Sequence, residues 1–318
     1  MHIHSLKRAV IAACLLALTA APAAVADSVP AELRVEAGAG ADLTHGWTYF
    51  SDTTTIKTDT TEACGGSGQS HTFEGPTALG ILEHARLHND QLDPLRVSDK
   101  FDFGMLVCGI RDFTASDSRF WTYKVNHVAP EVAAEQYPLK SGDDVLWAFQ
   151  NIESGSNTGN ELELVSPATV EAGEPFEVTV SQYDFAGAKS PAAGVEVGGA
   201  PGAVTDEQGR ATVTLDDDRP SRVLRAYRGV DIPSAPVRVC VGRCERIAMK
   251  RIFGTAARDV IAARGDLAEY VYASGGNDRI DVRGDSFSDR VRCGAGRDRV
   301  LADADDRVGR DCERVTRS

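Results

Sequence analysis

A short internal repeat in residues 254–308 constrains the fold more than any other feature of the chain. In each copy an acidic residue is followed two positions later by an apolar β-branched residue, and successive acids are 10, 9, 11, 9 and 8 positions apart. Glycines precede the acid in the clearest copies, residues 275–280 and 294–300. A period near nine with this pattern is typical of a parallel β-roll. The repeated acids are Asp259, Glu269, Asp278, Asp289, Asp298 and Asp306.

In such a roll two halves of about nine residues form one coil, so acids about 18 positions apart stack on the same side. Ca²⁺ takes six to eight oxygen ligands, which aspartates and turn carbonyls of successive coils can supply. We therefore expect calcium as a cofactor, with Asp259, Asp278, Asp289, Asp298 and Asp306 as ligands. The two predicted rows are Asp259, Asp278 and Asp298, and Glu269, Asp289 and Asp306. A thin core is predicted from Ile261, Val271, Ile280, Val291, Val300 and Val308.

Over about 55 residues this pattern resembles the haemolysin-type calcium repeats of secreted proteins, in a degenerate form that we place within residues 250–314. The resemblance implies structural calcium. An alternative stays open, because arginine follows four of the six acids and a guanidinium can pair with a carboxylate in place of a metal. A Cys293–Cys312 disulfide would also stabilise the coil. That alternative is a metal-free roll laced with ion pairs.

The first 26 residues have the pattern of a secretory signal peptide. Lys7 and Arg8 precede an apolar run at residues 9–21, and residues 24–26 give a small-x-small cleavage pattern. Residues 11–14 also resemble a lipoprotein cleavage site ending at Cys14, but the apolar run continues beyond that cysteine. No other stretch is apolar enough to span a bilayer. We expect a secreted, extracellular protein without a membrane span.

Six cysteines follow the predicted signal peptide, and an even number in an exported chain indicates disulfides. Proximity within the predicted domains favours three pairs. Reduced or metal-bound thiols are the alternative, although none of the cysteines has a further His or Cys partner at zinc spacing. The expected pairs are Cys64–Cys108, Cys240–Cys244 and Cys293–Cys312.

The formal net charge of −13 is distributed unevenly. Residues 245–318 contain 15 Lys or Arg and 14 Asp or Glu, so the acidity lies in the preceding part of the chain. A strongly acidic chain repels nucleic acid and anionic membranes. We therefore expect neither as a partner.

The segment before the repeat divides into two domains at a polar linker, residues 153–160. Residues 31–152 contain an alternating strand, a helical pattern at 75–89 and further strands at 120–126 and 145–149. This order predicts a β-grasp domain, with one sheet packed on one helix. Residues 161–240 contain several short strands between turn residues, which predict a β-sandwich. The expected fold class is mainly β with a small α+β head and a C-terminal parallel β-roll.

The first domain carries a more specific pattern. Residues 120–126 (FWTYKVN) and 137–147 (YPLKSGDDVLW) resemble the C-terminal β-domain of transcobalamin, which also occurs in bacterial exported proteins. Phe120 and His127 stand where that family has glycine. The resemblance implies a ligand or protein contact, but not cobalamin caging, because the helical barrel needed for caging is missing. Residues 161–240 resemble bacterial immunoglobulin-like spacer domains.

Candidates for catalysis are weak. His84 and His88 share a predicted helix face, but Ala85 stands where a metalloprotease has glutamate, so we expect surface histidines. No nucleophile elbow, phosphate loop or dinucleotide fingerprint is present. Trp121 and Tyr123 lie on one strand face, where core packing is the default expectation and ligand stacking the alternative.

These observations favour a secreted, non-enzymatic, modular binding protein whose partner is an unidentified protein or a component of the cell envelope. One alternative is a small-ligand carrier that uses Trp121 and Tyr123, and an open apolar groove beside Trp121 would favour it. The other is a secreted hydrolase, which a perturbed carboxylate or a Cys–His contact in a cleft would favour.

Overall fold

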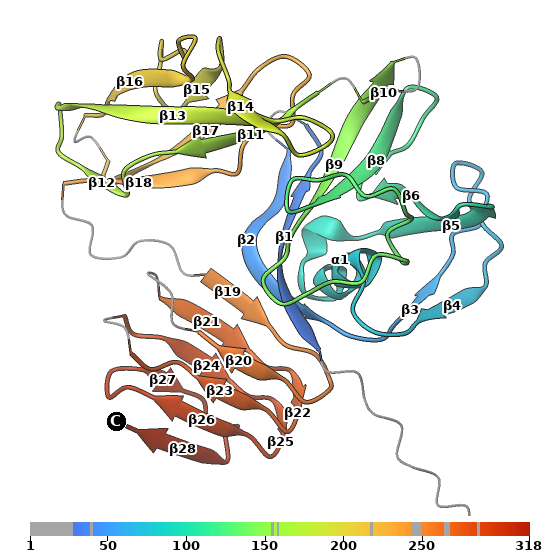
Figure 1. The fold of residues 1–318 in the computed structure, drawn as a ribbon. Coiled ribbons are helices and arrows are strands. Elements are labelled where there is room, and N and C mark those ends of the chain that lie inside the picture. Colours follow the sequence, from blue (N-terminus) through green and yellow to red (C-terminus); the bar gives the residue numbers. More distant parts are fainter. Residues whose placement is uncertain are drawn as a thin grey trace, which may run out of the picture.

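The computed structural model describes residues 28–38, 41–153, 156–157, 159–216, 219–242, 250–263, 268–284 and 287–318. The predicted signal peptide and Cys244 lie outside these residues. The described chain is mainly β, as expected, and forms three units that we call the head (28–153), the sandwich (159–242) and the roll (250–318) (Figure 1).

The head is a mixed sheet packed on the one α-helix of the described chain. Strand β1 (Val29–Glu36) pairs antiparallel with β2 (Asp42–Ser51) and parallel with β9 (Asp144–Glu153), which pairs with β8 (Arg119–Val125). Helix α1 (Ala78–His88) begins after Thr77, whose hydroxyl accepts the amide of Gly80. Its buried face packs on this sheet, as the helical pattern predicts. The remaining elements of the head and linker are β3 (Thr54–Lys57), β4 (Ser70–Phe73), η1 (Asp90–Leu92), β5 (Leu95–Phe101), β6 (Gly104–Ile110), β7 (Phe113–Thr114) and β10 (Ser156–Asn157).

The sandwich has two four-stranded sheets around an aliphatic core that includes Leu162, Val180 and Leu224. The first sheet contains β11 (Glu161–Val165), β13 (Pro175–Tyr183), β14 (Lys189–Pro191) and β16 (Arg210–Thr214). The second contains β12 (Thr169–Val170), β15 (Glu196–Gly198), β17 (Ser221–Tyr227) and β18 (Val237–Val241).

The roll consists of two parallel sheets that alternate along the chain, as the repeat predicts. One contains β19 (Lys250–Phe253), β21 (Glu269–Tyr272), β24 (Arg290–Arg292) and β27 (Arg307–Val308). The other contains β20 (Val260–Ala262), β23 (Arg279–Asp281), β26 (Arg299–Ala302) and β28 (Arg314–Arg317). Two short strands, β22 (Gly275–Gly276) and β25 (Ala295–Gly296), pair at a turn. Five of the predicted core residues are buried and Val308 is half-buried: Ile261, Val271, Ile280, Val291 and Val300 form the core.

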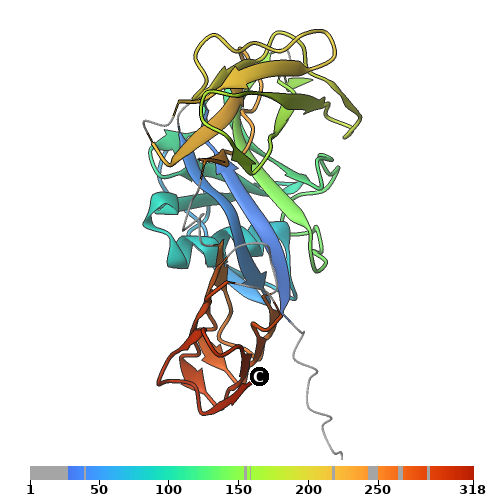
Figure 2. The same ribbon diagram turned by 90° about the vertical axis from the view of Figure 1, so that its left-hand side faces the viewer.

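The head sheet continues directly into the roll. Strand β19 pairs in parallel with β2, so that Ile252 lies opposite Thr48 and Phe253 opposite Tyr49. The combined sheet has the order β10-β9-β1-β2-β19-β21-β24-β27, with the roll below the head and the sandwich above it in Figure 2. This pairing covers the first edge of the roll, which would otherwise expose unpaired backbone groups.

Buried ion pairs join the head to the sandwich. Glu161 of β11 contacts Arg34 at 2.9 Å, Lys124 at 3.5 Å and His127 at 3.0 Å. The His127 ring also stacks on Tyr183, with centroids 3.7 Å apart. The histidine that departs from the family pattern is therefore a docking residue for the sandwich.

Candidate functional sites: carboxylate rows in the roll and a groove in the head

The first predicted row of acids is a ladder of hydrogen bonds inside the roll. The amide of Asp259 donates to Asp278 Oδ1, and the amide of Asp278 donates to Asp298 Oδ1, both at 2.8 Å. The amide of Asp298 in turn donates to Glu313 Oε2 at 2.8 Å. Row one therefore contains Asp259, Asp278, Asp298 and Glu313. Sequence reasoning missed Glu313, although the acid-x-valine pattern continues there with Val315.

Row two follows the same geometry on the opposite side. The amide of Glu269 donates to Asp289 Oδ1 at 2.8 Å, and the amide of Asp289 donates to Asp306 Oδ1 at 2.9 Å. Asp306 Oδ2 accepts the amide of Asp303. The six predicted acids of the two rows are at most 5% exposed. The repeat thus brings together, in two rows, the six acidic side chains that the sequence pattern predicts.

The environment of row one disfavours negative charge. Burial raises the pKa of Asp278 to about 7, and the neighbouring charges of Asp259 and Asp298 add to this effect. Burial also raises the pKa of Asp259, whose carboxylate accepts hydrogen bonds from Ser28 and Thr255. Asp278 Oδ2 and Asp298 Oδ2 are buried and accept no hydrogen bond from the described residues. Each of these two oxygens therefore has lone pairs that no described residue occupies.

The arginines that follow the acids do not neutralise them. Arg279, Arg299 and Arg307 are exposed, and Arg290 lies over the ring of Tyr270 at 5.8 Å. Within the described residues, no ion pair joins these four side chains to an acid of either row. Successive side chains of a strand point to opposite faces, so an arginine directly after an inward acid points outward. The alternative of a roll laced with such pairs is therefore not supported.

The acids of the rows are spread along the roll and do not form one cluster. Among the described residues, no three His, Cys, Asp or Glu side chains gather at one point. The glycine turns of successive coils lie close together: a Cβ at Gly296 would collide with the carbonyl of Gly276. Gly296 and Gly276 also have positive φ angles. Calcium accepts such mixtures of carboxylate and carbonyl oxygens.

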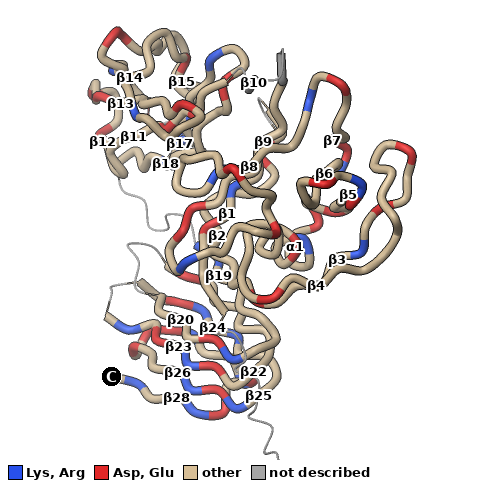
Figure 3. Tube along the Cα trace, turned by 45° about the vertical axis from the view of Figure 1, so that its right-hand side comes forward, with Lys and Arg blue, Asp and Glu red and all other residues tan. Residues whose placement is uncertain are grey.

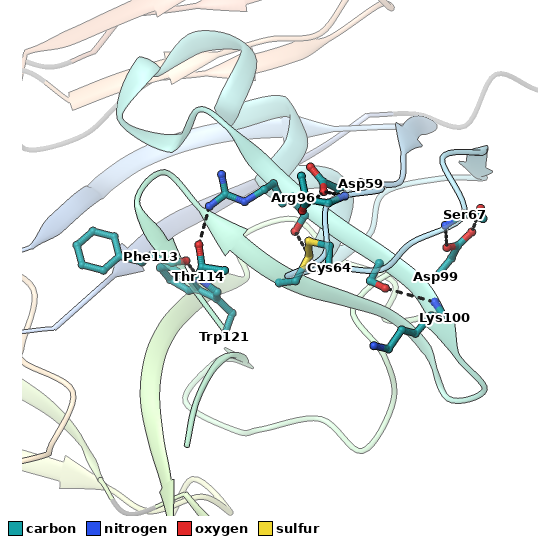
Figure 4. Close-up of a disulfide and its surroundings, with 12 residues drawn as sticks. Asp59, Cys64, Ser67, Arg96, Asp99, Lys100, Phe113, Thr114 and Trp121 are labelled. Carbon is teal, nitrogen blue, oxygen red and sulfur yellow. Dashed lines mark hydrogen bonds between the residues drawn. A yellow bond between two sulfur atoms is a disulfide. The ribbon is translucent and has the colours of Figure 1, made fainter. Parts of the chain in front are cut away.

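Two of the predicted disulfides are formed. Cys64 is bonded to Cys108, which ties the loop after β3 to β6 (Figure 4). Cys293 is bonded to Cys312 and links the turns after β24 and before β28. The third predicted pair, Cys240–Cys244, includes a residue outside the described chain.

An apolar groove of about 420 Å³ lies beside the two aromatic residues that the sequence singled out. The Trp121 indole is 3% exposed and donates to the carbonyl of Phe113 at 2.9 Å (Figure 4). The Tyr123 hydroxyl donates to the carbonyl of Val132. Both rings are thus anchored in the core, and they also line the groove. The other lining residues include Phe103, Met105, Trp147 and Phe185.

A more polar cleft of about 820 Å³ separates the head from the sandwich and includes Glu36 in its lining. Burial raises the pKa of this carboxylate to about 7, although Arg225 and Arg34 oppose the shift. Glu36 is only 1% exposed and is ion-paired with Arg225. It is a perturbed carboxylate in a cleft, but its burial and its arginine partner make it a structural ion pair rather than an accessible acid.

The two helix histidines occupy different environments. His88 is exposed, as expected, and stacks on Phe253 with centroids 5.1 Å apart. The expectation is wrong for His84, which is half-buried and donates from Nε2 to the carbonyl of Gly254 at 3.0 Å. Burial lowers the pKa of His84 to about 4, so the ring is neutral at pH 7. His84 therefore connects α1 to the first turn of the roll.

Comparison with known proteins identifies one part of the chain. No curated protein and no solved structure is significantly similar to it. Among the described residues, no helix is long and apolar enough to cross a membrane. Residues 77–151 match a family described as a domain of unknown function (DUF4430), so this part of the head is a DUF4430 domain, a member of a transcobalamin-like family.

Proposed function

We propose that the chain is a secreted, non-enzymatic, modular binding protein whose roll binds structural calcium along its carboxylate rows. The observation that carries this proposal is the pair of buried oxygens in row one, Asp278 Oδ2 and Asp298 Oδ2, which accept no hydrogen bond from the described residues. A buried carboxylate oxygen that accepts no hydrogen bond carries an uncompensated desolvation penalty. A bound divalent cation would remove that penalty.

The residues of the rows fit such an ion. Asp278 and Asp298 would hold it in row one, and Asp289 and Asp306 in row two, with carbonyl oxygens of the glycine turns as further ligands. Asp259 and Asp306 are weaker ligands than the sequence suggests, because hydrogen bonds already reach both oxygens of each carboxylate. Calcium would neutralise the rows and stiffen the part of the chain that extends the head sheet.

Thermal unfolding in EDTA and in excess Ca²⁺ tests this proposal. A ligand that binds only the folded roll at about one hundred times its Kd stabilises it by about 2.7 kcal/mol, so the midpoint of the roll transition rises. Mg²⁺ should raise it less, because that ion demands a tighter octahedral geometry. Superimposable curves in EDTA and Ca²⁺ would contradict the proposal.

Two double variants test whether row one causes the calcium-dependent rise of the midpoint. Asp278→Asn with Asp298→Asn keeps an acceptor for each ladder hydrogen bond but removes both charges, and should abolish most of the calcium shift. The matched control is Glu207→Gln with Asp216→Asn, which removes two exposed charges from the sandwich and should leave the shift intact. An equal shift in both double variants would exclude row one as the site.

The groove beside Trp121 supports a second binding function, for a small apolar ligand. Its lining is mostly aromatic and aliphatic, and Phe103 and Phe185 are 60% and 59% exposed. Such a concave apolar surface is the usual form of a small-molecule site. Anilinonaphthalene sulfonate, an apolar fluorescent probe, should bind there, and Phe103→Ala with Phe185→Ala should weaken its binding several-fold. Leu87→Ala, at a site 62% exposed outside the groove lining, is the control. Equal probe binding by both variants would contradict this function.

A further inference from the structure

Burial of the acids leaves the outside of the roll basic. Its described residues include 13 Lys or Arg and 11 Asp or Glu, which is nearly neutral by count. Six of those acids, however, are the buried members of the two rows. The basic residues instead occupy the outer faces, where Figure 3 shows them on successive strands. The surface of the roll therefore differs in sign from the acidic chain as a whole.

Three of these arginines lie at directly opposite positions on three neighbouring strands. Arg279 of β23 lies opposite Arg299 of β26, and Arg299 lies opposite Arg314 of β28. We call Arg279, Arg299 and Arg314 the arginine ladder. Neighbouring strands are about 4.8 Å apart, so the ladder repeats a positive charge at that interval. All three residues are exposed.

The arginine ladder forms no ion pair within the described chain. None of the three side chains makes an ion pair or hydrogen bond with another described residue. Asp281, on the same face, is already paired with Arg283 at 2.9 Å. Like charges directly opposite one another on neighbouring strands destabilise a sheet. An external partner with regularly spaced negative charges would offset this repulsion.

We propose that the arginine ladder binds an acidic polysaccharide that carries a carboxylate on successive sugars. The planar guanidinium is suited to bidentate contact with a carboxylate. An open sheet face suits an extended polymer along which carboxylates recur. The net charge of −13 would repel the much denser charge of nucleic acid. The inference rests on the proposed binding function and names its partner, but it does not require calcium.

In the test, the chain without its signal peptide is titrated with polygalacturonate, and the heat of binding is measured by calorimetry. EDTA removes calcium bridges between the polymer and the protein, and the temperature stays below the melting midpoint measured in EDTA. Binding should weaken as salt is raised, because exposed charges are screened. The triple variant Arg279→Gln, Arg299→Gln, Arg314→Gln should bind at least tenfold more weakly. Dextran, a neutral polymer, should not bind.

The matched control is Lys57→Gln with Arg210→Gln and Arg238→Gln, which removes three exposed charges from the head and sandwich. It should bind within twofold of the unmodified chain. If the triple variant proves unfolded by circular dichroism, Arg299→Gln alone should still weaken binding about threefold. Equal affinity of ladder and control variants would overturn the proposal, as would tighter binding of DNA or polyphosphate. The calcium-dependent melting shift should be the same in both variants, which separates this test from that of calcium binding.

Discussion

In the sandwich, two antiparallel sheets enclose a layer of aliphatic side chains, whereas the roll encloses a thinner aliphatic column flanked by two rows of carboxylates. Buried charges at the edge of the sandwich are paired across the interface with the head, as in Glu161–Arg34 and Arg225–Glu36. The row acids accept backbone amides instead. The sandwich therefore depends on apolar burial, while the roll also depends on how its negative charge is neutralised.

The largest expected effect is on the stability of the sandwich, and it distinguishes the core of the sandwich from the core of the roll. Leu224→Ala removes a fully buried side chain of the sandwich and should destabilise it by about 2–5 kcal/mol. The calcium-dependent rise of the roll midpoint should remain, because no contact with the rows is lost. Calorimetric unfolding in EDTA and Ca²⁺ measures both transitions. If Leu224→Ala abolished the calcium shift, the sandwich and the roll would not be stabilised independently of each other.

A smaller effect comes from the disulfide in the roll. Replacing Cys293 and Cys312 by alanine opens a loop with a sequence separation of 19 and should cost the roll about 3 kcal/mol. Calcium should recover part of this loss, since it links the same coils. The control replaces Cys64 and Cys108 in the head, where calcium should recover nothing. Equal recovery in both variants would contradict a calcium site confined to the roll.

A further comparison uses the dependence of roll stability on pH without calcium. Because the pKa of Asp278 is raised from 3.8 to about 7, mainly by burial, the folded roll binds a proton that the unfolded chain releases. Stability in EDTA should therefore fall as pH rises from about 4 to about 7. In excess Ca²⁺ this dependence should weaken or reverse, because protons compete with the metal.

The sandwich supplies the comparison for that measurement. The pKa of Glu161 lies below its ordinary value: burial opposes this shift, but the His127 hydrogen bond and Arg34 outweigh it. Its stabilising effect should be lost only as pH falls below about 4. Over pH 5 to 8 the roll midpoint in EDTA should therefore fall, while Glu161 adds no pH dependence to the sandwich transition. A roll midpoint that rises with pH in EDTA would show that the row acids are not shifted as described.

The regular parts of the fold could be predicted because their patterns are local. The period near nine places Ile280 and Val300 inward and Asp278 and Asp298 in one row, and the structure agrees. The helix of the head follows in the same way from its apolar spacing. In these segments a few consecutive residues determine which side chains are buried.

Contacts between the units could not be predicted in this way. The pairing of β19 with β2 joins residues about 200 positions apart, and no short pattern marks it. The same holds for His84 with Gly254 and for His127 with Glu161. The role of neither histidine is visible in the sequence, because its partner comes from another unit. The groove also depends on Phe185 of the sandwich approaching the head, which strand alternation around Trp121 does not reveal.

The central claim is that the buried carboxylates of the roll bind calcium. Calorimetric titration of Ca²⁺ into the metal-free chain tests it most directly, with Asp278→Asn, Asp298→Asn as the site variant and Glu207→Gln, Asp216→Asn as the control. Saturable binding by the unmodified chain and the control, with weakened or absent binding by the site variant, is the predicted result. No binding heat at any of several temperatures, or identical titrations for the site variant and the control, would contradict it.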